Sequence, residues 1–296
     1  MALGTKLATR RLAGGEVALV RFATGILVVA VAVASGAARI RPRRWGWLAA
    51  RGLFGGIAVV SYFASIQAVP VGVATLLNQT QPIYTMLFSW LLLRERPRGA
   101  AVVALGLALA GVAIIVDARA TAGAGAGAAG GRPLIPALRE ARGELLGVLS
   151  AVTSGIAVTS IRAARRDRGD GTPHETAWSV FFSFTFLGAL VSLPAVFPPF
   201  GSYLPPTRGE WALLAGVGVT SACAQLIMSA SLRHLTGVQS GIVAQLTVPI
   251  TVALGIGWLG ERLTATFLLG AAVTVAGVLL VIVTAAPVAA APGSGP

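Results

Sequence analysis

Residues 71–93 have the sequence VGVATLLNQTQPIYTMLFSWLLL, an apolar run that is interrupted near its middle by polar residues and a proline. The run contains no charged residue, and it is long enough to cross a bilayer, which takes about 20 mostly apolar residues in a helix. Because proline has no N–H for the carbonyl group four residues earlier, Pro82 leaves the carbonyl of Asn78 free. We therefore expect a membrane helix that is broken near the membrane midplane.

The second half of the chain contains a counterpart of this run. Residues 235–259 have the sequence LTGVQSGIVAQLTVPITVALGIGWL, in which Pro249 frees the carbonyl of Gln245. A common shift of 166 residues aligns further pairs: Trp45 with Trp211, Gly52 with Gly218, Ala64 with Ala230, Glu95 with Glu261, and Gly111 with Gly277. Such matches in order predict an internal repeat.

Nine stretches are apolar and long enough to span a bilayer. They are residues 17–38, 45–69, 71–93, 99–116, 143–161, 176–197, 211–232, 235–259 and 263–286. Four lie in the first half and five in the second, and an odd number of helices per repeat gives the repeats opposite orientations. We expect an all-α, polytopic membrane helix bundle. It would consist of two inverted five-helix repeats with the first helix largely missing, which leaves nine full transmembrane helices.

The domain organisation follows from the same pattern. We expect a first, N-terminally truncated repeat in residues 1–118, a Gly/Ala-rich linker in 119–142, a second repeat in 143–286 and a disordered tail in 287–296. The linker contains TAGAGAGAAGG at 121–131, a composition typical of flexible chain. Residues 6–10 are similar to 162–166, at the end of the fifth stretch. This likeness favours a Met1 that lies inside or just after a helix of a longer protein.

The composition excludes several classes of protein. Only 11% of the residues are charged, whereas a soluble domain carries roughly a quarter, so the chain lacks the charge to cover a water-facing surface. The net charge of +13 comes mainly from arginine clusters between apolar runs, as in residues 39–44, 94–98 and 162–168. Without interleaved aromatic residues these clusters do not indicate nucleic-acid binding, and they are typical of cytoplasmic loops. We expect a multi-pass protein of the plasma (inner) membrane.

The sequence contains no recognisable catalytic or cofactor site. The two histidines are far apart, Cys223 is the one cysteine, and no pair of carboxylates shares a membrane depth. The glycines of residues 125–130 match a dinucleotide fingerprint, but they lack the preceding strand that the fingerprint requires. We therefore expect no enzyme activity, no cofactor and no metal. The expected partners are a small-molecule substrate and the lipid bilayer, nucleic acid is excluded, and a homodimer stays open.

The polar residues around the two prolines are the candidate substrate-binding residues. Unpaired polar groups in hydrocarbon cost several kcal/mol, so these side chains should face the bundle interior. The candidates are Asn78, Gln81, Tyr84 and Gln245, with Tyr62 and Gln225 as weaker members. The alternative is that they only hydrogen-bond neighbouring helices, at about 1 kcal/mol each. Arg21 and Arg51 lie near helix starts and are interpreted as interface anchors whose long side chains reach the membrane surface.

These features together resemble the drug/metabolite transporter superfamily of the EamA-repeat type. The residues that carry the resemblance are Arg21-Phe22, residues 64–96 with Pro82 and Arg94-Glu95-Arg96, residues 230–262 with Pro249 and Gly260-Glu261-Arg262, and Gly111 and Gly277. The resemblance implies ten helices in two inverted repeats around a central cavity, and the absent first helix departs from it.

The function that follows is a secondary transporter or exporter of small polar metabolites or drugs. It would work by alternating access through the central cavity. Two alternatives stay open: a membrane protein that binds or senses without transporting, and a truncated, inactive transporter.

Overall fold

The regular structure of the protein is helical in the residues that the computed structural model describes, which are 1–94, 103, 106–107, 110–111, 113–114, 141–165, 175–197, 206–231, 247–261 and 264–284. The helices are α1 (Ala2–Ala8), α2 (Gly14–Ala34), α3 (Trp45–Ala68), α4 (Val71–Asn78), α5 (Gln81–Leu93), α8 (Arg142–Arg165), α9 (Ala177–Ser192), α10 (Arg208–Ser231), α12 (Thr247–Leu259) and α13 (Ala265–Thr284), with a 3-10 turn η2 (Pro194–Val196). The predicted all-α bundle is confirmed.

Several of these helices have the length and composition of membrane spans. Among the described residues, Gly14–Ala34, Trp45–Ala68 and Arg142–Ala164 are long and apolar enough to cross a bilayer, and three shorter apolar helices accompany them. Large apolar side chains face outward, including Leu27 and Trp258, which are 62% and 73% exposed. Such a surface is suited to lipid. The total of nine spans stays a prediction, because most of residues 95–118 and all of residues 232–246 lie outside the described part. The domain boundaries also stay predictions, because residues 119–140 and 287–296 lie outside it.

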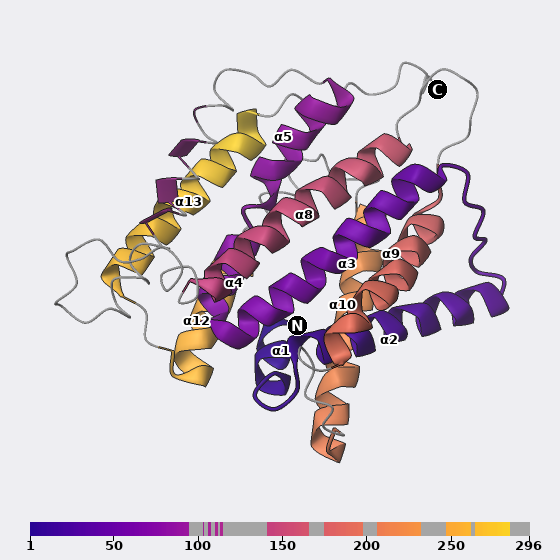
Figure 1. The fold of residues 1–296 in the computed structure, drawn as a ribbon, viewed down its shortest axis with the longest axis horizontal. Helices are drawn as coiled ribbons and strands as arrows, with labels where there is room; N and C mark the ends of the chain where they lie inside the picture. Colours follow the sequence, from indigo (N-terminus) through magenta and orange to yellow (C-terminus); the bar gives the residue numbers. More distant parts are fainter. Residues whose placement is uncertain are drawn as a thin grey trace.

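The helices of the two halves are interleaved (Figure 1). α3 packs against α8 and α9, while α2 packs against α9 and α10, and α4 against α12. The short α1 packs mainly on α10. Trp45 of α3 aligns with Trp211 of α10, so α3 and α10 are equivalent helices of the two repeats. The contact of α1 with α10 therefore corresponds to the contact of α8 with α3. That residues 6–10 are the counterpart of the end of α8 stays a prediction.

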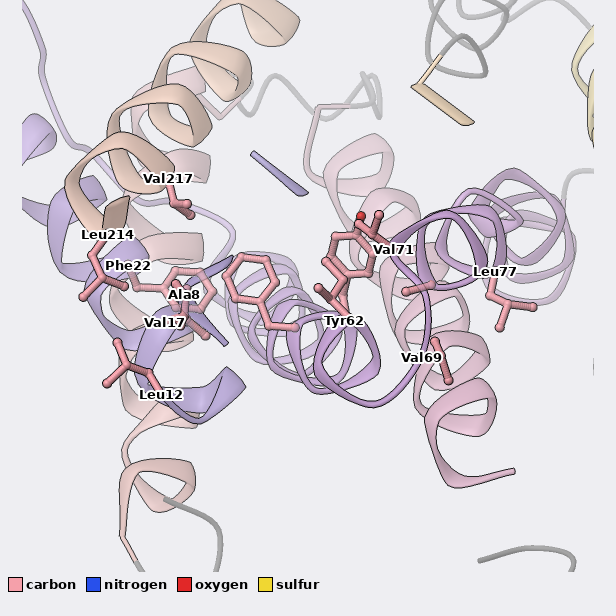
Figure 2. Close-up of a cluster of buried hydrophobic side chains, with 14 of the residues drawn as sticks. Ala8, Leu12, Val17, Phe22, Tyr62, Val69, Val71, Leu77, Leu214 and Val217 are labelled. Atoms are coloured by element: carbon pink, nitrogen blue, oxygen red, sulfur yellow. The ribbon is translucent and has the colours of Figure 1, made fainter. Parts of the chain in front are cut away.

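One buried apolar cluster runs through this arrangement. Figure 2 shows Leu214 and Val217 beside Phe22 at one end, Leu77 at the other, and Tyr62 between them. Members of the cluster come from both halves of the chain. The two halves therefore share one core, and the contact between them is part of that core.

The glycines of α3 bring the two halves into close contact. A Cβ atom on Gly52 would lie 2.5 Å from the backbone oxygen of Ser183, and one on Gly56 would lie 2.9 Å from the Cα of Gly188, both on α9. The hydroxyl of Ser183 also donates a hydrogen bond to the carbonyl of Leu48. Small residues four apart thus let the two backbones approach, as their spacing predicts.

The predicted break in the helix of residues 71–93 is confirmed. α4 ends at Asn78 and α5 begins at Gln81, with a turn between them. Pro82 lies in the first turn of α5, where its missing N–H would have had no helical partner. The hydroxyl of Thr80 donates to the carbonyl of Leu77 at 2.6 Å and closes the end of α4.

The helices α5 and α12 end in the same backbone conformation. Arg94 has φ 56° and Gly260 has φ 67°, and the two positions are 166 residues apart. This left-handed conformation suits glycine and costs other residues about 1 kcal/mol. We expect Arg94→Gly to raise the free energy of unfolding by about 1 kcal/mol, measured as the thermal unfolding midpoint in detergent. The matched change Gly260→Arg should lower that midpoint, and a lower midpoint for Arg94→Gly would contradict the assignment.

Candidate functional site

The candidate residues at the helix break lie beside α8. The amide nitrogen of Asn78 donates a hydrogen bond to the Ser150 hydroxyl at 2.6 Å. Gln81 begins α5 and is half-buried, and Tyr84 follows, also half-buried and packed against Gly155 of α8. The Asn78 amide therefore joins two helices here, and its role in substrate binding stays a prediction.

The other candidates are spread over the bundle. Tyr62 on α3 is buried, and its hydroxyl is 2.9 Å from that of Thr75 on α4, where either group can donate. Gln225 is half-buried on α10, and Gln245 lies outside the described residues. Tyr62 and Asn78 thus have different partners, Thr75 in the first half and Ser150 in the second.

Arg21 and Arg51 are buried inside the bundle, so the interpretation as interface anchors is wrong. Only 6% of Arg21 and 8% of Arg51 is exposed. The Nε of Arg21 donates to the hydroxyl of Ser221 at 2.5 Å. The side chains do not reach the surface because α9 and α10 pack over α2, and α9 over α3.

Aromatic rings hold both guanidinium groups. The Cζ atom of Arg21 is 5.1 Å from the ring centre of Phe22 and 5.3 Å from that of Phe184. The Cζ atom of Arg51 is 4.3 Å from the Phe184 ring centre. Each cation–π contact stabilises the charge by about 0.5–2 kcal/mol. The two arginines therefore meet at one ring, Phe184.

The Phe184 ring lies near the middle of α9 and between the two halves. The arginines belong to α2 and α3 of the first half, whereas Phe184 and Ser221 belong to α9 and α10 of the second. Phe184 is near the middle of α9, and Ser221 is near the middle of α10. We call Arg21, Arg51, Phe184 and Ser221 the arginine site.

Two hydrogen-bond donors of the arginine site have no acceptor. The Nη1 of Arg21 and the Nε of Arg51 are buried and have no hydrogen-bond partner. Within the described part of the chain neither arginine forms an ion pair. A buried, unpaired charge costs several kcal/mol even after relaxation, and charged residues within membrane segments mark ligand pathways. The arrangement can accept an anionic group.

Sequence reasoning missed the partners of this site. Two arginines inside apolar stretches were a signal, because charges at membrane depth are costly and functional. No signal pointed to Phe184, which lies in an aromatic run, or to Ser221. Those two residues become part of the site only through the packing of α9 and α10 on the first half.

The chain is similar to known transporters over most of its length. Pseudopaline exporter CntI from Pseudomonas aeruginosa is 26% identical over 254 residues, which are 86% of this chain and 79% of that protein. An uncharacterized transporter from Archaeoglobus fulgidus is 27% identical over 229 residues, which are 77% of this chain and 73% of that one. A chain of known crystal structure shares the fold with a TM-score of 0.61 and 20% identity, covering 95% of this chain and 92% of that one.

The family assignment follows from the whole length of the chain. The model of the EamA-like transporter family matches residues 1–117 and 141–283. The helical bundle and its outward apolar surface agree with a membrane protein that contacts lipid and takes a small-molecule substrate, as the resemblance predicted. This chain belongs to the EamA-like transporter family and is a membrane transporter.

Proposed function

We propose that this protein is a secondary transporter that exports small polar metabolites or drugs across the plasma (inner) membrane by alternating access. The observation that carries the proposal is the arginine site, whose unpaired donors on α2 and α3 lie buried against α9 and α10 of the other half. A substrate site near the midplane at the interface between repeats is typical of secondary transporters. The export direction is supported by the relative that is named an exporter.

The fold also supports relative movement of the two halves. Gly52 and Gly56 of α3 have no side chains of their own to interlock with α9, although Leu187 and Val191 of α9 pack against them. The turn between α4 and α5 divides one predicted span into two short helices. Alternating access is mostly the rocking of one repeat against the other. We take the repeats of residues 1–118 and 143–286 as the moving units, with the central cavity between them.

Flux through the purified protein tests the proposal. A resistance screen of cells with and without the chain supplies candidate substrates, and each is then loaded into proteoliposomes that contain the full chain. We expect saturable efflux that empty liposomes lack. Saturable binding of a substrate without any flux would instead identify a binding or sensor protein, or an inactive transporter.

Asn78→Leu separates a substrate-binding role from a structural one. Leucine keeps the size but removes the amide, so we expect transport to fall about fivefold, the equivalent of one hydrogen bond of about 1 kcal/mol. The control is Ser150→Ala, which removes the partner of Asn78 but leaves the amide in place. If both variants lower stability equally and neither changes the transport rate or the apparent affinity, Asn78 is structural. Gln245→Leu is tested in the same way.

A further inference from the structure

We propose that the arginine site binds a carboxylate of the transported substrate, so that the substrates are organic anions. The inference rests on the proposed function in one respect, namely that the bound carboxylate belongs to a transported substrate. It starts from the two buried donors that lack a partner, the Nη1 of Arg21 and the Nε of Arg51. Carboxylates are acceptor-only groups with two oxygens, and they complement guanidinium donors in charge and in shape.

Four of the described glutamates are engaged away from the arginine site. Glu175 accepts from the backbone N–H groups of Arg43 and Arg44 at 2.6 Å, and Glu261 accepts from that of Val71 at 2.7 Å. Glu16 accepts from the N–H of Ala13 at 2.8 Å, and Glu210 forms an ion pair with Arg11 at 3.1 Å. These four glutamates serve helix starts and loops, so none of them neutralises the arginine site.

The residues around the two arginines fit an anion that carries an organic part. Ser221 accepts from the Nε of Arg21 and fixes the direction of its guanidinium group. Phe22 and Phe184 pack edge to face, with ring centres 5.3 Å apart, and supply apolar walls beside the charges. Gly55 lets the Phe184 ring and the Arg51 guanidinium pack closely against α3, since a Cβ atom on it would lie 2.8 Å from the ring and 3.4 Å from the Nη1 of Arg51. Two like charges at one ring repel cationic substrates and attract anions.

Ligand-induced stabilisation of the full chain in detergent measures binding without requiring transport. The thermal unfolding midpoint is followed at low ionic strength during titration with sodium benzoate, succinate and glutamate. The neutral amides of these acids serve as matched ligands, and sodium chloride at equal ionic strength is the reference. We expect a saturable rise in the midpoint with at least one carboxylate, because ligands that bind only the folded state stabilise it, and no rise with its amide.

The variants Arg21→Gln and Arg51→Gln locate the binding. Each should raise the apparent dissociation constant at least about tenfold, the effect of losing a charged hydrogen bond. The control Arg39→Gln removes an exposed arginine just beyond α2 and should leave the constant within about twofold, as surface substitutions do. If a glutamine variant does not fold, the lysine variant replaces it. Lysine keeps the charge but loses the planar fork, so weaker binding is still expected.

The outcomes are separable. Carboxylate binding that is equal in wild type, Arg21→Gln and Arg51→Gln would overturn the inference, as would the absence of any stabilising carboxylate. Stabilisation by inorganic phosphate or by phosphatidylglycerol alone would also overturn it and would assign the site to phosphate groups. Carboxylate binding at the arginines without flux in proteoliposomes would refute the proposed function but leave the anion site standing. Flux of a neutral substrate without anion binding would refute the anion site but leave the proposed function standing.

Discussion

Gly52→Leu is expected to remove most of the folded protein, whereas Gly46→Leu in the same helix leaves it folded. Even the first side-chain carbon at position 52 would lie 2.5 Å from the backbone oxygen of Ser183 and 2.7 Å from the Cβ of Leu187. Leucine adds three more carbons at a place where one has no room, so α3 and α9 must separate. Overpacking of this kind costs about 3 kcal/mol or more. The yield of monodisperse protein in size-exclusion chromatography is the measurement.

Gly46 is a matched control because it lies in the first turn of α3, and a Cβ atom there meets nothing within 4 Å. Both substitutions replace glycine with a good helix former, which favours the helix by up to about 1 kcal/mol in each case. The difference between them therefore isolates the contact with α9. Equal yields for the two variants would show that α3 and α9 are not packed backbone to backbone.

Lys6→Met is expected to lower the free energy of unfolding by about 3 kcal/mol. The Nζ of Lys6 donates to the carbonyl of Ile66 at 2.6 Å and to that of Val69 at 2.7 Å. The residue four positions after Ile66 is Pro70, which has no N–H to donate to the Ile66 carbonyl. Lys6 of α1 supplies that missing donor. Hydrogen bonds to charged groups are worth about 1.5–3 kcal/mol each. Thermal unfolding in detergent tests the expectation.

Arg10→Met is the control for this change. Arg10 follows α1 closely, carries the same charge and is exposed, so its loss should change stability by less than about 0.5 kcal/mol. A similar fall for Arg10→Met and Lys6→Met would mean that net charge, rather than the two carbonyl contacts, stabilises the corner between α3 and α4. The opposite side of that corner is served by Glu261, which accepts from the N–H of Val71.

Much of the fold was predictable because it depends on local chemistry. The length of an apolar run predicts a membrane helix, and the missing N–H of Pro82 predicts the break that separates α4 from α5. The spacing of Gly52 and Gly56 predicts a close helix contact, and the structure confirms one with α9. Which helix they contact was not predictable, because that choice depends on residues far away in the chain.

The site was less predictable for the same reason. A membrane-embedded arginine can extend to the surface or turn inward, and the neighbours that decide between these are not local. For Arg21 and Arg51 the deciding neighbours are Phe184 and Ser221, more than 130 residues away along the chain. The amide of Asn78 poses the same difficulty, since its partner Ser150 lies on α8. The sequence identified polar groups at membrane depth but not their partners.

The left-handed conformation of Arg94 has a consequence for biosynthesis. The finished fold would be more stable with glycine there, as it has at Gly260. However, a helix must be oriented in the membrane before it packs, and arginines beside a helix end favour keeping that end on the cytoplasmic side, which is the side predicted for residues 94–98. A residue that weakens the completed structure can thus increase the share of chains that insert the right way round. At this position, the equilibrium of folding and the fidelity of insertion favour different amino acids.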